Sequence, residues 1–290
     1  MDSVGSYAST GLLRQFNLLS QYVGHGAAYC DSDMANIRLV ESRIKETFGV
    51  ILDNLDILEA GAGQFLGQTM YLALWNRVTA IDRDVIPYKT GISGYVRMLR
   101  VNGAQRTIKT IGRKALGVDR GYRKQWREHV GQMPLPKICT RQMDVNHLDF
   151  PDHKFDFVFA RSVLHHLPDP SHSLREMTRV LRPGGIGYIS IHPYTSPTGC
   201  LDSRVQYGNP GPLGYWPHLR EETAHLVRSA APLNKLRVAQ WRDIFLALPH
   251  AHIFVSPIAS EYSELAKQVP NYSVEELTAG SIAATWRKEL

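Results

Sequence analysis

Residues 56–84 read DILEAGAGQFLGQTMYLALWNRVTAIDRD, and this stretch decides the fold. Asp56–Ala60 is a short apolar run that stops at a glycine, which is typical of a buried strand. Gly61 and Gly63 then predict a tight turn, because glycine adopts backbone conformations that other residues avoid. The first part of the stretch therefore predicts a strand that leads into a glycine turn.

The second part of the stretch completes a βαβ unit. Gln64–Trp75 has helical periodicity, and Arg77–Ile81 is a second apolar strand that ends at Asp82. A unit of this kind binds a nucleotide at the carboxyl ends of its strands. Asp82 lies about twenty residues after Gly61, where an acid can accept hydrogen bonds from both ribose hydroxyls.

The glycine spacing disfavours a dinucleotide as the ligand. The dinucleotide fingerprint needs a third glycine five residues after the first, and Leu66 stands at that position. A pyrophosphate would meet the leucine side chain there. A tight turn that binds no ligand is the other interpretation of this pattern.

Length and composition indicate an ordinary globular protein. The chain has 290 residues, of which 43% are hydrophobic and 21% are charged. No apolar run approaches the ~18 residues of a membrane span, and the N-terminus shows no signal-peptide pattern. The three cysteines are widely spaced, which favours reduced thiols in a cytoplasmic protein over disulfides or a metal cluster.

The positive charge is concentrated in one segment. The net charge is +6, and the positive charge of residues 84–136 exceeds it, because the remainder of the chain is slightly negative. Ile108, Ile111, Leu116 and Val118 give this segment an apolar face, and several glycines predict that it breaks into short helices. Three interpretations stay open: a solvated helical insertion, a site for an anionic substrate or anionic lipid headgroups, and a nucleic-acid surface.

Three further motifs follow in order between residues 144 and 185. They are D-V-x-x-L-x-F-P-D-x-x-F-D-F-V, V-L-H-H-L-x-D-P and R-V-L-R-P-G-G. Together with Glu59-x-Gly61-x-Gly63, they resemble the class I S-adenosylmethionine (SAM) methyltransferases of the methyltransferase 11-type branch. The resemblance covers about residues 55–192.

The resemblance implies an α/β fold of the Rossmann-like, three-layer sandwich type. Its sheet has seven mostly parallel strands with an antiparallel last strand, and here a helical insertion follows the second strand. We expect one domain over residues 1–290. It comprises an N-terminal helical cover (1–54), the basic insertion (84–136) and a substrate-side loop region (193–237). Within the cover, Met34–Phe48 has helical spacing, and Asp31, Ser32 and Asp33 are candidate N-caps.

The resemblance also implies the cofactor, SAM, with S-adenosylhomocysteine as product. By this likeness Glu59 lies near the methionine amino group, Gly61 and Gly63 give backbone approach, and Asp82 holds the ribose. Asp144 and the backbone of Val145 would read the adenine edge, and Ala160 would face the methionine portion. These seven residues are the predicted cofactor-binding set. Phe65 stands where many members carry another glycine, so we expect it to narrow the pocket beside the methionine tail.

Two histidines are candidate catalytic bases. His166 follows the fourth predicted strand and His192 ends the fifth, so both fall at the carboxyl edge of the sheet. An unperturbed histidine titrates near pH ~6.5 and can accept a proton at neutral pH. A structural role, in which the ring ties a loop to a carbonyl, is the alternative for each. The histidines match no metal-ligand spacing, so no metal site is predicted.

The predicted function is methyl transfer by in-line displacement to a small-molecule acceptor. The acceptor group would be a hydroxyl of a glycan, glycolipid or secondary-metabolite intermediate, with anionic or lipid-linked acceptors included. Alternatives are an RNA or protein methyltransferase that uses the basic insertion, and a non-catalytic SAM-binding scaffold. Nucleic acid is the less favoured partner, peripheral membrane contact through the insertion stays open, and the sequence leaves the oligomeric state undetermined.

Overall fold

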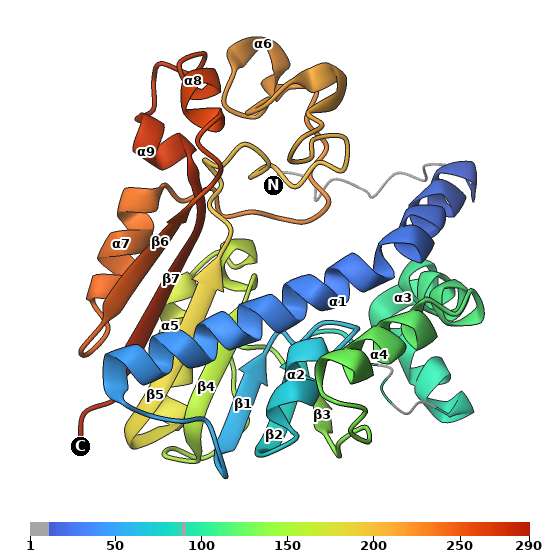
Figure 1. The fold of residues 1–290 in the computed structure, drawn as a ribbon, viewed down its shortest axis with the longest axis vertical. Helices are drawn as coiled ribbons and strands as arrows, with labels where there is room; N and C mark the ends of the chain where they lie inside the picture. Colours follow the sequence, from blue (N-terminus) through green and yellow to red (C-terminus); the bar gives the residue numbers. More distant parts are fainter. Residues whose placement is uncertain (1–11, 87, 89–90) are drawn as a thin grey trace. The chain divides into compact units, whose positions relative to one another are not determined.

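The computed structural model describes residues 12–86, 88 and 91–290 of the chain, shown as a ribbon in Figure 1. Its strands are β1 (Asp56–Ala60), β2 (Arg77–Asp82), β3 (Cys139–Gln142), β4 (Phe155–Arg161), β5 (Leu181–Ile191), β6 (His252–Pro257) and β7 (Ala279–Arg287). Its longer helices are α1 (Leu12–Phe48), α3 (Ile92–Ala115), α4 (Val118–His129), α5 (Pro170–Val180) and α7 (Val238–Leu246). The shorter ones are α2 (Gly67–Leu72), α6 (Glu221–Ala224), α8 (Tyr262–Ala266), α9 (Val274–Leu277) and the 3₁₀ turns Leu164–His166 and Gly211–Leu213.

Within the described residues the strands form a seven-stranded sheet in the order β3-β2-β1-β4-β5-β7-β6. β1 pairs in parallel with β2 and β4, and β4 pairs in parallel with β5. β7 runs antiparallel to both of its neighbours. The predicted fold, a mostly parallel Rossmann-like sheet with an antiparallel last strand, is confirmed. The strand order changes direction between β1 and β4, and folds of this kind bind ligands at the carboxyl ends of the strands at that point.

The contacts between residues group the chain into two compact units. The first contains the described residues up to Leu52 together with Gly63–Trp75 and Asp84–Gln142. The second contains Asp53–Ala62, Asn76–Arg83 and Met143–Leu290. The basic insertion thus shares a unit with the N-terminal helix, although the two are far apart in sequence. The single-domain organisation inferred from the sequence stays a prediction.

The second unit has a core on one face of its strands. Alternate residues of β1 and β4, such as Leu58, Ala60 and Val158, are buried there against α5 and α7. The helices contribute Met177 and Trp241 to the same cluster. Strands that are buried on both faces read as continuous apolar runs, which is why the sequence pattern identifies them.

Residues 193–237 fold together with the segment between β6 and β7. Trp216 packs with Tyr262 and Leu277 in a small separate core, and the Trp216 indole donates to the Thr195 carbonyl at 3.0 Å. In Figure 1 this cap, which includes α6, α8 and α9, lies beyond the carboxyl end of β5. Among the described residues between β6 and β7, two short helices form, α8 and α9.

The first unit is held together by aromatic residues of α4. The Trp126 indole is fully buried and donates to the Gly67 carbonyl at 3.1 Å. The Tyr122 hydroxyl donates to Asp33 of α1 at 2.5 Å. A side chain at Gly67 would collide with that hydroxyl, since a Cβ there would lie 1.8 Å from it. The insertion is therefore packed on α1 and on the start of α2.

Two local predictions for this unit are wrong. Asp31, Ser32 and Asp33 do not cap a helix, because α1 runs through them. The glycines of the insertion also differ in effect. Gly103 kinks α3 with a φ of 79°, and Gly117 separates α3 from α4, whereas Gly112 and Gly121 lie inside helices.

Candidate active site

Three carboxylates of the second unit lie at or beside the carboxyl ends of β1 and β2. Glu59 is the penultimate residue of β1 and is only 6% exposed. Asp82 ends the adjacent β2, and its carbonyl accepts a hydrogen bond from the Met143 amide at 2.9 Å. That bond brings Asp144 beside Asp82. The sequence-predicted acids therefore stand in the order Asp144, Asp82, Glu59 along one edge.

Gly61 is required by the geometry of the turn. Its φ is 72°, and a Cβ there would lie 2.1 Å from a methyl group of Val163. The amides of Gly61 and Ala62 both donate to the Ile81 carbonyl, at 2.8 and 3.1 Å. Glycine is needed here because Val163 packs against the turn, and the backbone approach of a ligand at Gly61 stays a prediction.

Gly63 begins the segment that belongs to the other unit. It has a φ of 68°, and a Cβ built on it meets no atom within 4 Å among the described residues. The predicted approach of the cofactor to the Gly63 backbone needs such open space beside a left-handed residue.

The three remaining predicted cofactor residues, Asp144, Val145 and Ala160, differ in exposure. Asp144 is exposed, and its carboxylate accepts from the Asn146 amide at 2.9 Å in an Asx turn. Val145 is buried in the main core. Ala160 is fully buried and pairs with β1 on one side and β5 on the other. β4 ends at Arg161, so the accessible positions at its carboxyl end are Arg161 and Ser162.

The 3₁₀ turn after β4 holds His166 in a fixed position. The His166 Nδ1 atom lies 2.8 Å from the Pro232 carbonyl, so it carries the proton and donates. This leaves Nε2 as the proton-accepting nitrogen of the neutral ring. The structural tie and the catalytic role are thus compatible in one tautomer.

Asn234 supports the same turn, and sequence reasoning missed it. Its side-chain amide donates to the carbonyls of Leu164 and Leu167 at 2.9 and 3.0 Å. Its backbone amide donates to the His165 carbonyl at 2.9 Å. No local motif marks Asn234, because its partners lie about 70 positions earlier in the chain.

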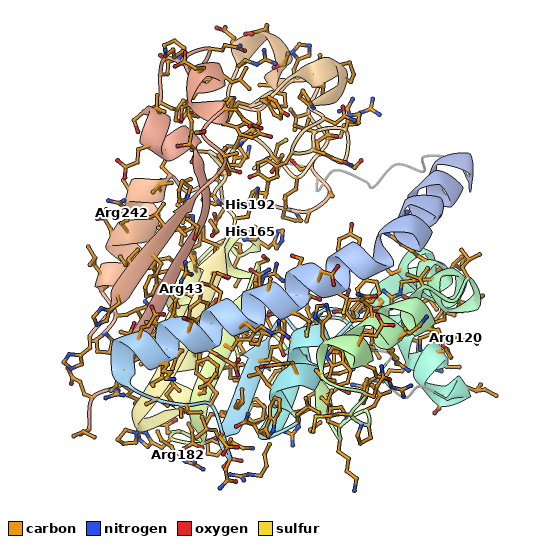
Figure 2. The ribbon with its side chains drawn as sticks, in the orientation of Figure 1. Arg43, Arg120, His165, Arg182, His192 and Arg242 are labelled. Carbon is orange, nitrogen blue, oxygen red and sulfur yellow. The ribbon has the colours of Figure 1, made fainter. Side chains whose placement is uncertain are left out.

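His165 is buried beside these groups. It is 4% exposed, its ring centroid lies 4.1 Å from that of His166, and Figure 2 shows it near His192. Burial, reinforced by the His166 and His192 charges, lowers the pKa of His165 to about 3. Burial also lowers the pKa of His218 to about 4. Both rings are therefore neutral at physiological pH.

We expect these two histidines to make the protein acid-labile. Their folded-state pKa values lie below the ordinary histidine value, so the unfolded chain binds protons first as the pH falls. The stabilisation is complete above pH ~6.5 and is lost toward pH 3–4, by up to about 1.4 kcal/mol per pH unit for each ring. Urea midpoints measured from pH 7.5 downward should fall, and His165→Gln should flatten that dependence. The exposed His225→Gln serves as control; equal slopes in all three proteins would refute the assignment.

His192 is engaged at both ring nitrogens. Nδ1 lies 3.0 Å from the Gly280 carbonyl and donates to it, so Nε2 accepts from the hydroxyls of Ser196 and Thr198 at 2.9 and 3.1 Å. Burial lowers the pKa of the His192 ring below its ordinary value. These bonds favour His192 as the anchor of the cap and leave His166 as the better-placed base.

Phe65 packs within the helical unit. Its ring stacks on Tyr122 with centroids 4.7 Å apart, and the Arg113 guanidinium lies 4.5 Å from the Phe65 centroid. Tyr29 of α1 stacks at 6.4 Å. The ring that was expected to narrow the methionine pocket thus contributes to the packing of the insertion.

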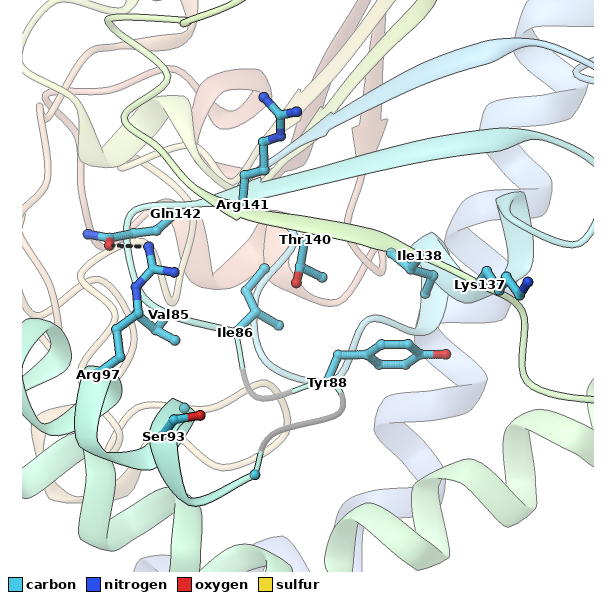
Figure 3. A pocket seen from close by; sticks show the side chains of 12 residues that line it. Val85, Ile86, Tyr88, Ser93, Arg97, Lys137, Ile138, Thr140, Arg141 and Gln142 are labelled. Carbon is cyan, nitrogen blue, oxygen red and sulfur yellow. Dashed lines mark hydrogen bonds between the residues drawn. The ribbon is translucent and has the colours of Figure 1, made fainter.

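The helical unit also contains a cavity of about 390 Å³, shown in Figure 3. Arg97 from α3 and Lys137 and Arg141 from the β3 region contribute cationic groups to its lining, and Val85 and Ile86 supply an apolar wall. Arg97 donates to the Gln142 side chain at 3.2 Å. The lining of this cavity suits a small anionic group with an apolar portion.

In the described part of the chain, no three histidine, cysteine, aspartate or glutamate side chains are arranged to hold a metal ion. Among the same residues, no helix combines the length and the apolar character needed to cross a membrane.

Comparison with known proteins points to one class. Residues 101–189 match the family model described as a methyltransferase domain. The 27-O-demethylrifamycin SV methyltransferase of Amycolatopsis mediterranei is 34% identical over 135 residues, covering 43% of this chain and 47% of the relative. The phosphatidylethanolamine N-methyltransferase of Cereibacter sphaeroides is 43% identical over 67 residues, covering 23% of this chain and 33% of the relative.

Solved structures include the phosphoethanolamine N-methyltransferase 2 of Haemonchus contortus in complex with SAM. It is 14% identical with a TM-score of 0.48, and the match covers 86% of this chain and 52% of that one. The present chain spans about half or less of the length of the two curated relatives that it matches.

These matches support a class I, SAM-dependent methyltransferase domain of the methyltransferase 11 type in this chain. The matched residues include Asp144, Val145, Ala160 and His166 and exclude the glycine turn. SAM is the cofactor of this class. The donor set suits it, because carboxylates at three adjacent strand ends can serve an ammonium group, paired ribose hydroxyls and an adenine amine. The individual cofactor contacts stay predictions.

Proposed function

We propose that the protein transfers the methyl group of SAM to a small-molecule acceptor, with a hydroxyl oxygen as the receiving atom. The observation that carries this proposal is the order of side chains along the sheet edge. Asp144, Asp82 and Glu59 follow one another toward β4, and His166 comes next, after the end of β4. An adenine, a ribose and a methionine group have the same order in the cofactor, with the sulfonium methyl between the ribose and the methionine amino group, so the base falls on the methionine side of the cofactor.

Bound SAM supplies an electrophilic methyl group on a sulfonium centre. The acceptor oxygen forms the new bond to carbon while the carbon–sulfur bond breaks, and the electron pair leaves with sulfur as a neutral thioether. The chain must therefore align the reactants and remove one proton. Alignment can contribute about 7–11 kcal/mol to such a step. His166 Nε2 takes the acceptor proton, because Nδ1 is committed to the Pro232 carbonyl.

The acceptor class follows from the cap and from the relatives. The cap places Tyr194 against His218, with ring centroids 4.6 Å apart, and Tyr207 at 6.4 Å from His192. Aromatic rings of this kind can stack on a sugar or a fused ring. One relative is named for 27-O-demethylrifamycin SV and another for phosphatidylethanolamine. These features support a glycan, glycolipid or secondary-metabolite intermediate over RNA, protein or a non-catalytic scaffold role.

The test is a transfer assay with SAM labelled in its methyl group. The purified protein is incubated with hydroxylated glycosides, glycolipids and polyketide-like compounds, and separately with transfer RNA and a protein mixture. Label in a small-molecule fraction supports the proposal if chemical methylation of the acceptor's hydroxyls before the assay abolishes the labelling. Label only in RNA or protein, or no S-adenosylhomocysteine with any acceptor, contradicts it.

A further inference from the structure

Helix α3 turns its apolar side outward. Ile92, Val96 and Leu99 have i, i+4, i+7 spacing, and Ile92 is 86% exposed while Leu99 is 50% exposed. Beyond the kink at Gly103, Ile108 is 64% exposed and Ile111 is 47% exposed. Residues at these spacings share one helix face, so each half of α3 carries an exposed aliphatic stripe.

The packed side of the second half of α3 is polar. Thr107, Thr110 and Arg113 are its buried residues. The Thr107 and Thr110 hydroxyls donate to the carbonyls four residues earlier at 2.8 and 2.9 Å. Arg113 donates to Asp119 at 2.6 Å. Because these bonds satisfy the buried polar groups, the inverted arrangement is compatible with a stable helix.

An inverted amphipathic helix implies an apolar partner for its outer face. A helix at the surface of a water-soluble unit normally buries its aliphatic residues and exposes its polar ones. Here at least five aliphatic side chains, those of Ile92, Val96, Leu99, Ile108 and Ile111, are among the exposed large hydrophobic residues of the chain. Apolar surface gathered in this way marks an interaction site.

The charge around the stripe selects the partner. Arg97 and Arg100 are exposed on the same helix, and Arg120 and Lys124 are exposed on α4. The segment 84–136 carries a large excess of basic residues, so two copies of it would repel one another. Exposed isoleucines have no ring to stack on nucleic-acid bases. Aliphatic side chains beside arginines instead fit a surface with acyl chains and anionic headgroups.

We propose that the exposed aliphatic faces of the two halves of α3 dock on anionic lipid membranes, with Ile92, Leu99, Ile108 and Ile111 inserted at the headgroup boundary and Arg100 paired with lipid phosphates. This peripheral contact holds the enzyme at a surface without spanning it. It rests on the exposure of α3 and stands apart from the identity of the methyl acceptor.

The experiment is flotation of the full chain with vesicles. We expect binding to vesicles of phosphatidylcholine with one third phosphatidylglycerol, little binding to phosphatidylcholine alone, and weaker binding at high salt. The combined variant Ile92→Ser, Leu99→Ser, Ile108→Ser, Ile111→Ser should lose at least about tenfold in vesicle affinity, because it removes four inserted side chains. Arg100→Gln should lose about fivefold, the typical contribution of one basic residue near an anionic surface.

The matched control is the pair Ile51→Ser, Leu246→Ser. These residues are 70% and 65% exposed and lie outside α3, so the double variant should bind vesicles like the parent protein. Thermal unfolding of every variant checks the fold, and SAM titration checks the cofactor site independently. Equal binding to neutral vesicles, or undiminished binding by the α3 variant, would overturn the proposal. It would also be overturned if the α3 substitutions abolished self-association or RNA binding while the parent protein ignored vesicles.

Discussion

His166→Ala is expected to lower the turnover number by about 10²–10⁴-fold, the usual contribution of a positioned general base. The His166 ring is oriented by its bond to the Pro232 carbonyl, and the turn that carries it is fixed by Asn234. The substitution removes the proton acceptor while leaving the strand-end carboxylates intact. SAM affinity should therefore change by less than about threefold, which separates the two functions.

Chemical rescue distinguishes a base from a structural histidine. Added imidazole should restore part of the activity of His166→Ala, because a small base can enter the space that the ring vacates. Asn234→Ala should lower turnover less and should not respond to imidazole, since Asn234 positions the turn and accepts no proton. His225→Ala, at an exposed position of the cap, should behave like the parent protein. Equal losses of turnover and SAM affinity in His166→Ala, without rescue, would assign His166 a structural role.

Asp82→Ala is expected to weaken SAM binding at least about tenfold, because two charge-assisted hydrogen bonds to the ribose are lost. Asp82 is half-buried at the end of β2, and β2 lies next to β1 in the sheet. A carboxylate there can accept from both ribose hydroxyls only if the ribose lies over this strand end. Isothermal titration of the variant measures the change directly.

A ligand change makes the same test more specific. S-adenosylhomocysteine that lacks the ribose 2′-hydroxyl should bind the parent protein more weakly than the complete molecule. The same comparison should show a much smaller difference in Asp82→Ala. Asp53→Ala, which removes an exposed carboxylate outside the strand-end row, should leave both affinities unchanged. If removal of the 2′-hydroxyl weakened binding to Asp82→Ala as much as to the parent protein, the ribose would lie elsewhere.

The parts of the fold that follow local rules could be predicted. β1 has the predicted bounds, and α5 begins by local rules, because Asp169 accepts from the His172 amide and Pro170 takes the first position. The buried strands read as apolar runs because they are covered on both faces. β5 begins at Leu181, which pairs with Phe155 of β4, and the residues that follow bulge out until Ile186 pairs with Phe157.

The parts that depend on tertiary partners could not be predicted. Asp33 reads as a helix cap, but its carboxylate accepts from Tyr122 at 2.5 Å and from Gln68 at 3.2 Å. Ile108 and Ile111 read as a packed face, yet they are exposed because hydrogen-bonded threonines occupy the packed side of α3. Periodicity identifies a helix and its stripe but does not say which side meets the rest of the protein.

The same limit applies to the site. The strand-end acids could be found because strand order brings chain-distant residues to one edge. The need for glycine at position 61 comes from Val163, about a hundred residues later, and the support of His166 comes from Asn234. Such contacts leave no spacing pattern in the sequence, since they join loops from separate elements.

Calorimetric titration of the unmodified protein with SAM, with NAD as the control ligand, tests the central claim most directly. The glycine turn lacks the third glycine of the dinucleotide fingerprint, and the strand ends offer carboxylates suited to an ammonium and a ribose. We predict saturable one-to-one binding of SAM in the micromolar range and no heat with NAD. Binding of NAD with no response to SAM would contradict the assignment of these strand ends to the SAM site.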